Sequence, residues 1–229
     1  MEGSGLISAK DFAGQSSVWR QIVPMLDRVV RWLNTQQQSL GRAVESYGIN
    51  QRHALIAETA FLMASSSYNT GQMLDGDYEG AARQALAGLP RSDFASEALT
   101  ISERGEAVKV SSKILRFLSG KSDIEFAPTV PGCGVIPHAH CDIRVATDLV
   151  EVKAVTRPFR GTDLRQLITY ATMYYAKGRR MDNLTLLNPR RARYVTMSLD
   201  TITQGASGRP SVEVMQDLVE AMVGLQVSA

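Results

Sequence analysis

Residues 141–155 read CDIRVATDLVEVKAV, two strand-like runs on either side of Ala146-Thr147. Side chains alternate between the two faces of a strand, so the register of a hairpin determines which side chains meet. If Ala146 and Thr147 form a two-residue turn, Asp142 lies opposite Glu151, on the face that Lys153 shares. The other face then carries only Ile and Val, whereas a slip of one residue would mix the faces. Because Ala-Thr lacks the Gly or Asn of primed turns, a longer turn with the same facing is the alternative.

Length and composition indicate an ordinary globular protein. The chain has 229 residues, of which 44% are hydrophobic and 21% charged, enough for one large domain or two small ones. It has no run of about 18 apolar residues, and residues 1–5 lack the basic and apolar pattern of a signal peptide. Cys133 and Cys141 are too few for a disulfide framework. We expect a cytoplasmic protein, or a nuclear or viral one, that is neither secreted nor inserted in a membrane.

The positive charge of the chain is concentrated in its second half. Residues 1–100 carry 8 basic and 10 acidic residues, and residues 101–229 carry 17 and 13. Between Lys153 and Arg193 there are 10 basic residues against Asp163 and Asp182 alone. Such an excess suits a polyanionic substrate, and a solvated basic surface is the alternative.

Hydrophobic periodicity predicts helices first and an α/β region afterwards. Predicted helices cover residues 19–40 (kinked or restarted at Pro24), 51–65, 78–87 and 93–118, with a break at 63–71. After Gly120 we expect, in order, a strand at 124–127, a loop at 128–137, the hairpin, a helix at 163–177 capped by Thr162, strands at 184–187 and 193–199, and a helix at 211–225. The order is helix, three strands, helix, two strands and helix, which predicts an α/β class.

This order and its motif residues resemble the PD-(D/E)XK nuclease superfamily, which has the restriction-endonuclease-like fold. Asp142 matches the aspartate of the second core strand, and Glu151-Val152-Lys153 matches the (D/E)-x-K of the third. Gln166 and Tyr170 match a glutamine and a tyrosine on the next helix, one turn apart. The resemblance covers residues 93–199. It implies a core with a mixed central sheet flanked by helices within residues 93–229, preceded by an all-helical region at 1–92.

The resemblance also implies a metal site for Mg²⁺ or Mn²⁺. Asp142 and Glu151 would be the carboxylate ligands, and the backbone carbonyl of Val152 a further ligand. Oxygen ligands of this kind suit a hard cation rather than zinc. Some members add a glutamate from the first core helix, for which the chain offers Glu97, Glu103 and Glu106, and we select Glu106.

Catalytic and substrate-binding roles follow from the same resemblance. Lys153 would assist the attacking water, and Gln166 would hold the lysine or the water. The implied activity is hydrolysis of phosphodiester bonds by an endonuclease or exonuclease, with DNA favoured over RNA as substrate. The candidate nucleic-acid contacts are Tyr170, Arg157, Arg160, Arg165, Arg190 and Arg191.

Three other interpretations use some of the same residues. His138, His140 and Asp142 form a His-x-His-x-Asp string of the metallo-β-lactamase type, but His53 is the only further histidine in the sequence. Cys133 and Cys141 with the two neighbouring histidines could bind zinc, although their spacing fits no usual pattern. The chain could also be a non-catalytic nucleic-acid-binding or assembly module, with its N-terminal helices used for a homodimer or a protein partner.

Overall fold

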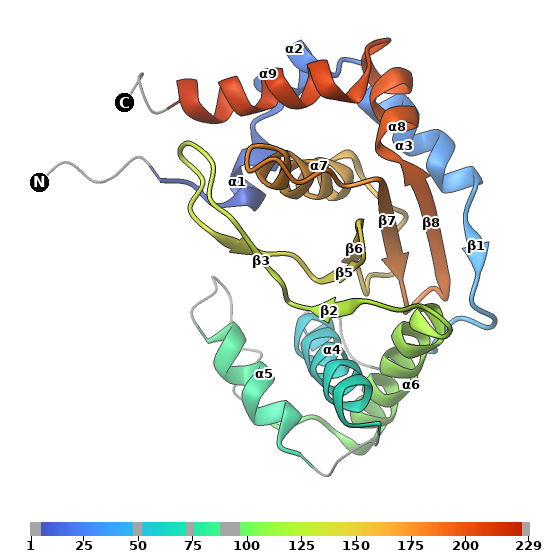
Figure 1. The fold of residues 1–229 in the computed structure, drawn as a ribbon. Helices are drawn as coiled ribbons and strands as arrows, with labels where there is room; N and C mark the ends of the chain where they lie inside the picture. Colours follow the sequence, from blue (N-terminus) through green and yellow to red (C-terminus); the bar gives the residue numbers. More distant parts are fainter. Residues whose placement is uncertain (1–5, 48–51, 72–75, 88–96, 226–229) are drawn as a thin grey trace, which may run out of the picture.

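A mixed six-stranded sheet lies at the centre of the computed structural model, which describes residues 6–47, 52–71, 76–87 and 97–225 (Figure 1). The strand order is β1-β8-β7-β6-β5-β2, with β6 and β7 parallel and all other neighbours antiparallel. The strands are β1 (Gln38–Ser39), β2 (Ile124–Phe126), β5 (Ile143–Val145), β6 (Asp148–Val152), β7 (Asn183–Asn188) and β8 (Arg193–Ser198). Between β2 and β5 the chain forms a small antiparallel ribbon from β3 (Thr129–Val130) and β4 (Ala139–His140). The predicted α/β class is therefore confirmed.

Helices cover both faces of this sheet. On one face lie α4 (His53–Thr70), α5 (Tyr78–Leu86) and α6 (Ile101–Leu118). The other face carries α7 (Gly161–Tyr175), which connects the parallel strands β6 and β7 (Figure 1). Outside and beside α7 pack α1 (Ala9–Gly14), α2 (Ser16–Ile22), α3 (Leu26–Thr35), α8 (Leu199–Ser207) and α9 (Ser211–Gly224). Within the described ranges, no helix combines the length and the apolar character needed to cross a membrane.

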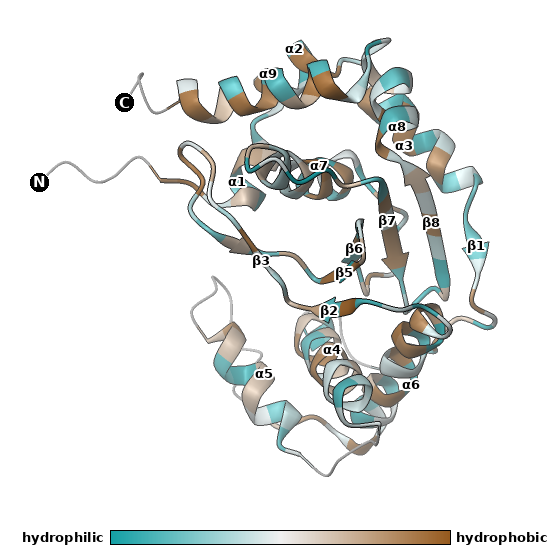
Figure 2. Ribbon diagram, in the orientation of Figure 1, coloured by the Kyte–Doolittle hydropathy of each residue, from teal (hydrophilic) through white to brown (hydrophobic). Residues whose placement is uncertain are grey.

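Alternation along β6 connects the sheet to both helical layers. Leu149 is buried in the core cluster that includes Leu164 of α7, and Val150 is buried with Ile114 of α6. Hydrophobic colouring accordingly runs through the central strands and the helix surfaces that meet them (Figure 2). The Ile and Val face expected for the hairpin packs toward α4 and α6. Period-two alternation thus directs Glu151 toward the α7 side.

The N-terminal helices belong to the same core as α7. Phe12, Trp19 and Leu26 are buried in one cluster with Leu164, and the Trp19 indole N–H donates to the Phe12 carbonyl at 3.0 Å. This segment, predicted to be all helical, also supplies β1, which pairs with β8 at the sheet edge. Residues 9–39 therefore share the core and the sheet of the residues beyond 97. The predicted boundary between 92 and 93 lies outside the described residues.

Element bounds depart from the sequence prediction in places where tertiary contacts outweigh local signals. Pro24 separates α2 from α3, as expected from its missing N–H. The predicted break at 63–71 is wrong, since α4 continues to Thr70; the hydroxyl of Ser66 in this stretch accepts from that of Tyr78 on α5, at 3.0 Å. Helix α7 begins at Gly161 rather than after Thr162, because Asp163 accepts the Arg160 backbone N–H at 2.8 Å.

Candidate active site

The hairpin that carries the candidate site has the predicted register. Val145 pairs with Asp148 and Ile143 with Val150, so Ala146-Thr147 forms the turn. Ala146 adopts a φ of +52°, a left-handed conformation that an L-residue takes at a cost. One residue before β5, Asp142 directs its Oδ2 to the backbone N–H of Val152, at 2.6 Å. The aspartate is thus anchored to the strand that carries Glu151.

Four of the predicted catalytic and contact residues form one hydrogen-bonded chain. The Lys153 ammonium donates to Glu151 Oε1 at 2.6 Å and to Gln166 Oε1 at 3.1 Å. One turn along α7, the amide Nε2 of Gln166 donates to the Tyr170 hydroxyl at 2.9 Å. Tyr170 thereby fixes which way the Gln166 amide points, with its oxygen toward the lysine.

Burial and mutual repulsion hold the carboxyls of this site in an unfavourable state. Glu151 is 2% exposed, and its Oε2 has no hydrogen-bond partner within the described part of the chain. Desolvation, with the Asp142 charge second, raises the pKa of Glu151 to about 8. Desolvation also raises the pKa of Asp142, against the Val152 N–H and Lys153. Burial alone would lower the pKa of Lys153, but the Glu151 carboxylate outweighs it and raises that pKa. The lysine is therefore an ammonium donor at neutral pH.

A third carboxylate, Glu58 of α4, faces the same site and was missed by the sequence analysis. Desolvation raises its pKa, and so does the Asp142 charge. It lies on the helix face that carries Ala54, Ala57 and Phe61, all of which line one cleft. A single carboxylate on a face otherwise made of alanine and phenylalanine is the signal that could have identified it. We had searched only residues 93–118, because the resemblance implies a glutamate from the first core helix.

The cleft has a volume of about 600 Å³ and lies between α4 and the end of β6. Asp142, Val152, Lys153 and Glu58 line it together with His140. No group of three or more His, Cys, Asp or Glu side chains in the described ranges is arranged to hold a metal ion. A cation here would therefore rely on two carboxylates and on backbone or water oxygens, with Glu58 as a neighbouring charge.

Glu106, the glutamate selected from the sequence, lies elsewhere. Its carboxylate is fully buried, pairs with the Arg190 guanidinium and accepts the Tyr47 backbone N–H at 2.8 Å. It is not among the residues that line the cleft. Arg190 is only 2% exposed and also donates to the Ala154 carbonyl at 3.0 Å, so its place is structural and not at a nucleic-acid surface. Neither residue is positioned in this structure for its predicted role.

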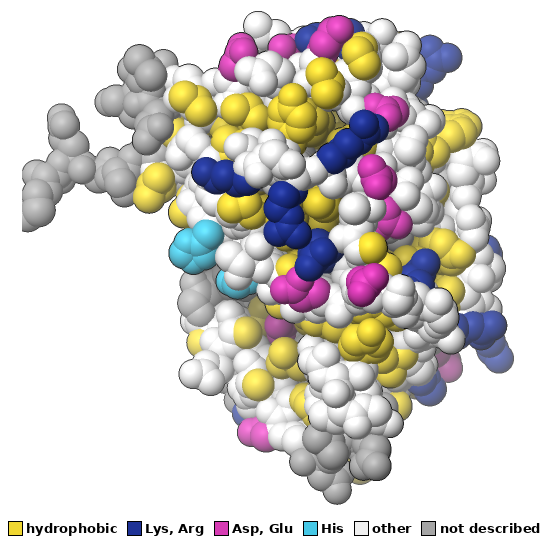
Figure 3. Space-filling model, in the orientation of Figure 1, with side chains coloured by type: hydrophobic (Ala, Val, Ile, Leu, Met, Phe, Trp, Pro, Cys, Tyr) yellow, Lys and Arg dark blue, Asp and Glu magenta, His cyan; other side chains and the backbone are white. Residues whose placement is uncertain are grey.

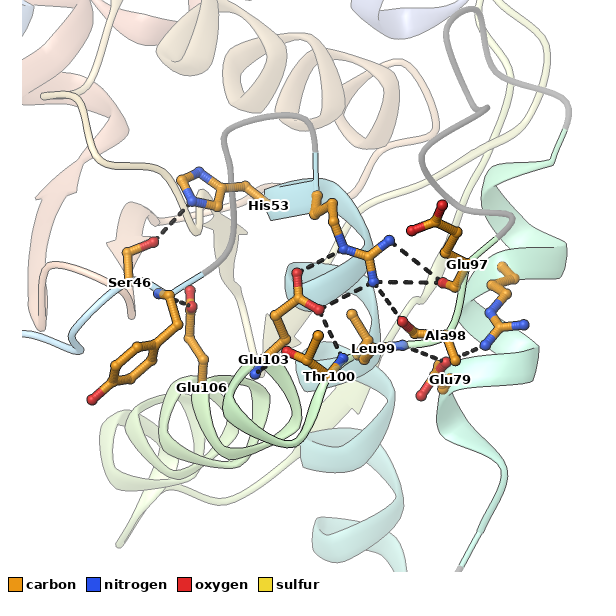
Figure 4. Close-up of polar contacts among 12 residues, drawn as sticks. Ser46, His53, Glu79, Glu97, Ala98, Leu99, Thr100, Glu103 and Glu106 are labelled. Carbon is orange, nitrogen blue, oxygen red and sulfur yellow. Dashed lines mark hydrogen bonds and ion pairs between the residues drawn. The ribbon is translucent and has the colours of Figure 1, made fainter.

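The other glutamates considered from the sequence hold α4 against α6. Arg52 makes a two-pronged contact with Glu103, at 2.6 and 3.1 Å, while Glu103 also caps α6 with Thr100 (Figure 4). The same guanidinium reaches the backbone carbonyls of Glu97 and Ala98. This network fixes the start of α4 and hence the position of Glu58.

The remaining predicted contacts differ in their exposure. Arg157 forms a two-pronged ion pair with Asp163, at 2.6 and 2.9 Å, at the start of α7. The Arg165 side chain is 12% exposed and lies 3.8 Å from Asp27. Arg160 is exposed, Arg191 is half-buried, and Tyr170 is 5% exposed. Arg160 is thus the most accessible member of the predicted set.

The two zinc interpretations gain no assembled ligand set. Cys133 and Cys141 are both buried free thiols. The rings of His138 and His140 lie 6.4 Å apart, and His140 Nδ1 is 3.1 Å from the Ala127 carbonyl oxygen. These side chains do not form a three-residue metal group in the described structure.

Comparison with known proteins identifies no relative. No protein-family model, no curated protein and no solved structure matches the chain. The functional argument therefore depends on the geometry of the site.

Proposed function

We propose that the chain is a metal-dependent nuclease that hydrolyses phosphodiester bonds, with DNA favoured over RNA. The observation that carries the proposal is the Glu151–Lys153–Gln166–Tyr170 chain beside Asp142, at the edge of a cleft. The element order α6, β2, β5, β6, α7 and β7 is also the order that the PD-(D/E)XK resemblance implies. Buried ionisable groups with displaced pKa values in a cleft are typical of functional sites.

The donor set fits a hard divalent cation such as Mg²⁺ or Mn²⁺. Asp142, Glu151 and the Val152 carbonyl would hold it, since all three supply oxygen atoms. Glu151 Oε2 is buried without a hydrogen-bond partner among the described residues, which is costly unless a ligand satisfies it. When bound, such a cation polarises the scissile phosphate and lowers the pKa of an attacking water.

The protein's own residues would position the substrate and stabilise charge. Lys153 has three N–H donors, of which two are directed to Glu151 and Gln166. The third can donate to a phosphate oxygen or orient the attacking water. Because the ammonium stays protonated, it acts by donating to developing negative charge and not as a base. Gln166 and Tyr170 hold that ammonium in place and are positioning residues.

Cleavage assays test this proposal directly. Purified protein is incubated with labelled single- and double-stranded DNA and RNA, in Mg²⁺, in Mn²⁺ and in EDTA. We expect cleavage only with the metals, and its loss in Asp142→Ala and Lys153→Ala. Lys177→Ala, at an exposed lysine just after α7, serves as the matched control. Equal cleavage by both site variants and the wild type would refute the assignment. Binding without cleavage would favour the non-catalytic module.

Tyr170→Phe separates positioning from simple packing. It removes the hydroxyl that orients the Gln166 amide and retains the buried ring. We expect a fall in kcat of roughly tenfold, the scale of one misplaced catalytic group, with KM unchanged. A fall in thermal stability with unchanged kcat would instead mean that the hydroxyl serves only the fold.

A further inference from the structure

A basic groove lies outside the catalytic cleft, between the loop after β1 and the exposed side of α6. It has a volume of about 580 Å³, and Arg42, Lys109 and Lys113 line it. Arg42 and Lys109 are exposed to solvent. Basic side chains are visible at the lower right of Figure 3, over α6 and this loop. None of these residues belonged to the set of contacts predicted from the sequence.

Two cations of this groove come unusually close together at Gly41. Lys113 Nζ and Arg116 Nη1 lie 3.7 and 3.2 Å from the point that a β-carbon on Gly41 would occupy. Gly41 itself has a φ of +93°, which favours glycine. Two like charges near one point repel each other, so this arrangement is favourable for an anion that would bind between them.

The groove also lacks compensating negative charge. Among the described residues, no carboxylate forms an ion pair with Arg42, Lys109, Lys113 or Arg116. Glu45 is the one acidic residue that lines the groove, and its Oε2 accepts the Tyr47 hydroxyl at 2.8 Å. Arg104, also on α6, is by contrast paired with Glu79. The groove therefore has a net positive charge.

The chain connects this groove to the catalytic cleft. Ser46 follows the groove residues, and its hydroxyl lies 2.8 Å from Nε2 of His53, which lines the cleft (Figure 4). From Arg42 to Ser46 the backbone can span at most about 14 Å. A duplex strand covers that distance in about four nucleotides, at roughly 3.4 Å of axis per nucleotide.

We propose that this groove binds the phosphate backbone of the nucleic-acid substrate about four nucleotides from the scissile phosphate. The inference depends on the proposed nuclease function and adds a substrate requirement to it. Oligonucleotides too short to reach from the cleft to Arg42 lose this contact. Longer ones gain affinity that depends on salt but not on base sequence, because phosphate contacts carry no sequence information.

Binding in EDTA tests the groove without cleavage. A labelled 30-base-pair DNA duplex is titrated with wild type, with Arg42→Ala/Lys109→Ala, and with Arg28→Ala/Arg31→Ala, which removes two exposed cations from α3 as the matched control. Each lost phosphate contact lowers the slope of log K against log salt by about 0.9, and so costs about eightfold in affinity at 0.1 M relative to 1 M salt. We expect the groove variant to lose about two units of slope and the control to retain the wild-type slope.

Cleavage of the same duplex separates the two hypotheses. We expect the groove variant to keep the wild-type kcat and to show a higher KM, with no difference on a tetranucleotide. A wild-type protein that cleaves, together with a groove variant of unchanged slope and KM, overturns the groove and leaves the nuclease function intact. A wild-type protein that neither binds nor cleaves nucleic acid overturns both. Binding to anionic phosphatidylserine vesicles but not to the duplex would assign the groove to a membrane surface.

Discussion

Replacing Glu151 by glutamine should stabilise the metal-free protein while abolishing its activity. The carboxyl is buried, and desolvation followed by the Asp142 charge raises its pKa to about 8. Keeping it protonated at pH 7, against an ordinary pKa of 4.5, costs about 3 kcal/mol. Glutamine has nearly the same shape and carries no such cost. Part of the gain is lost, because the new amide N–H₂ lies where Oε2 has no partner, and a buried unpaired donor costs about 1–3 kcal/mol.

The dependence on pH is the sharper part of this prediction. A carboxyl whose pKa is higher in the folded than in the unfolded protein favours folding below its unfolded pKa. That contribution is lost as the pH rises through the folded value, here between about 4.5 and 8. Wild type should therefore lose stability over this range relative to Glu151→Gln. The difference in free energy of unfolding should grow by about 3 kcal/mol from pH 5 to pH 8.

Urea unfolding in EDTA at pH 5, 6, 7 and 8 measures this difference. Glu220→Gln, at an exposed glutamate of α9, is the matched control, for which we expect no change with pH relative to wild type. Repeating the series in Mg²⁺ should stabilise wild type but not Glu151→Gln, since binding to the folded state alone stabilises it. A constant difference between the two proteins from pH 5 to pH 8 would refute the account of a desolvated, repelled carboxyl.

Three further predictions concern stability and can be checked by chemical denaturation. Glu103→Gln should cost about 2 kcal/mol at pH 7, since hydrogen bonds to charged groups are worth about that much; hydrogen bonding from Arg52 lowers the pKa of Glu103, so the cost should shrink as the pH falls below 4.5, and a cost that persists at pH 3 would contradict this. Arg190→Met should cost about 3–5 kcal/mol by leaving Glu106 charged and buried, and adding Glu106→Gln should recover much of the loss. Ala146→Gly should raise stability by about 0.5 kcal/mol, because relief of the left-handed φ slightly exceeds the entropy that glycine loses; a lower midpoint would argue against strain at this turn.

The hairpin and its neighbours could be predicted because their signals are local. Alternation of apolar and polar residues determined the register from Ile143 to Val152, and the Asp142, Glu151 and Lys153 positions followed from it. The i, i+4 spacing of Gln166 and Tyr170 placed both on one face of α7, where they are now hydrogen-bonded. In each case the relevant partner lies within one hairpin or one helical turn.

The parts that could not be predicted depend on distant partners. Glu58 reaches the site only because Arg52 and Glu103 fix α4 against α6, across an interval of about fifty residues. Strand β1 has two residues and is defined by its pairing with β8, more than 150 residues away. Glu106 was selected by its position on a helix, whereas Arg190, far along the chain, determines its actual environment.

The packing of α1 on α7 limits how this protein can be divided. Gln166 and Tyr170 point from α7 toward the lysine, while other α7 side chains, including Leu164, share a core with Phe12 and Trp19. A truncated chain beginning near residue 97 would expose that apolar side of α7 and remove β1 from the sheet edge. The helix that orients the catalytic lysine would lose its support from outside the sheet. For engineering, the smallest transferable unit therefore includes the N-terminal helices, and fusions or domain swaps should leave residues 9–39 joined to the rest.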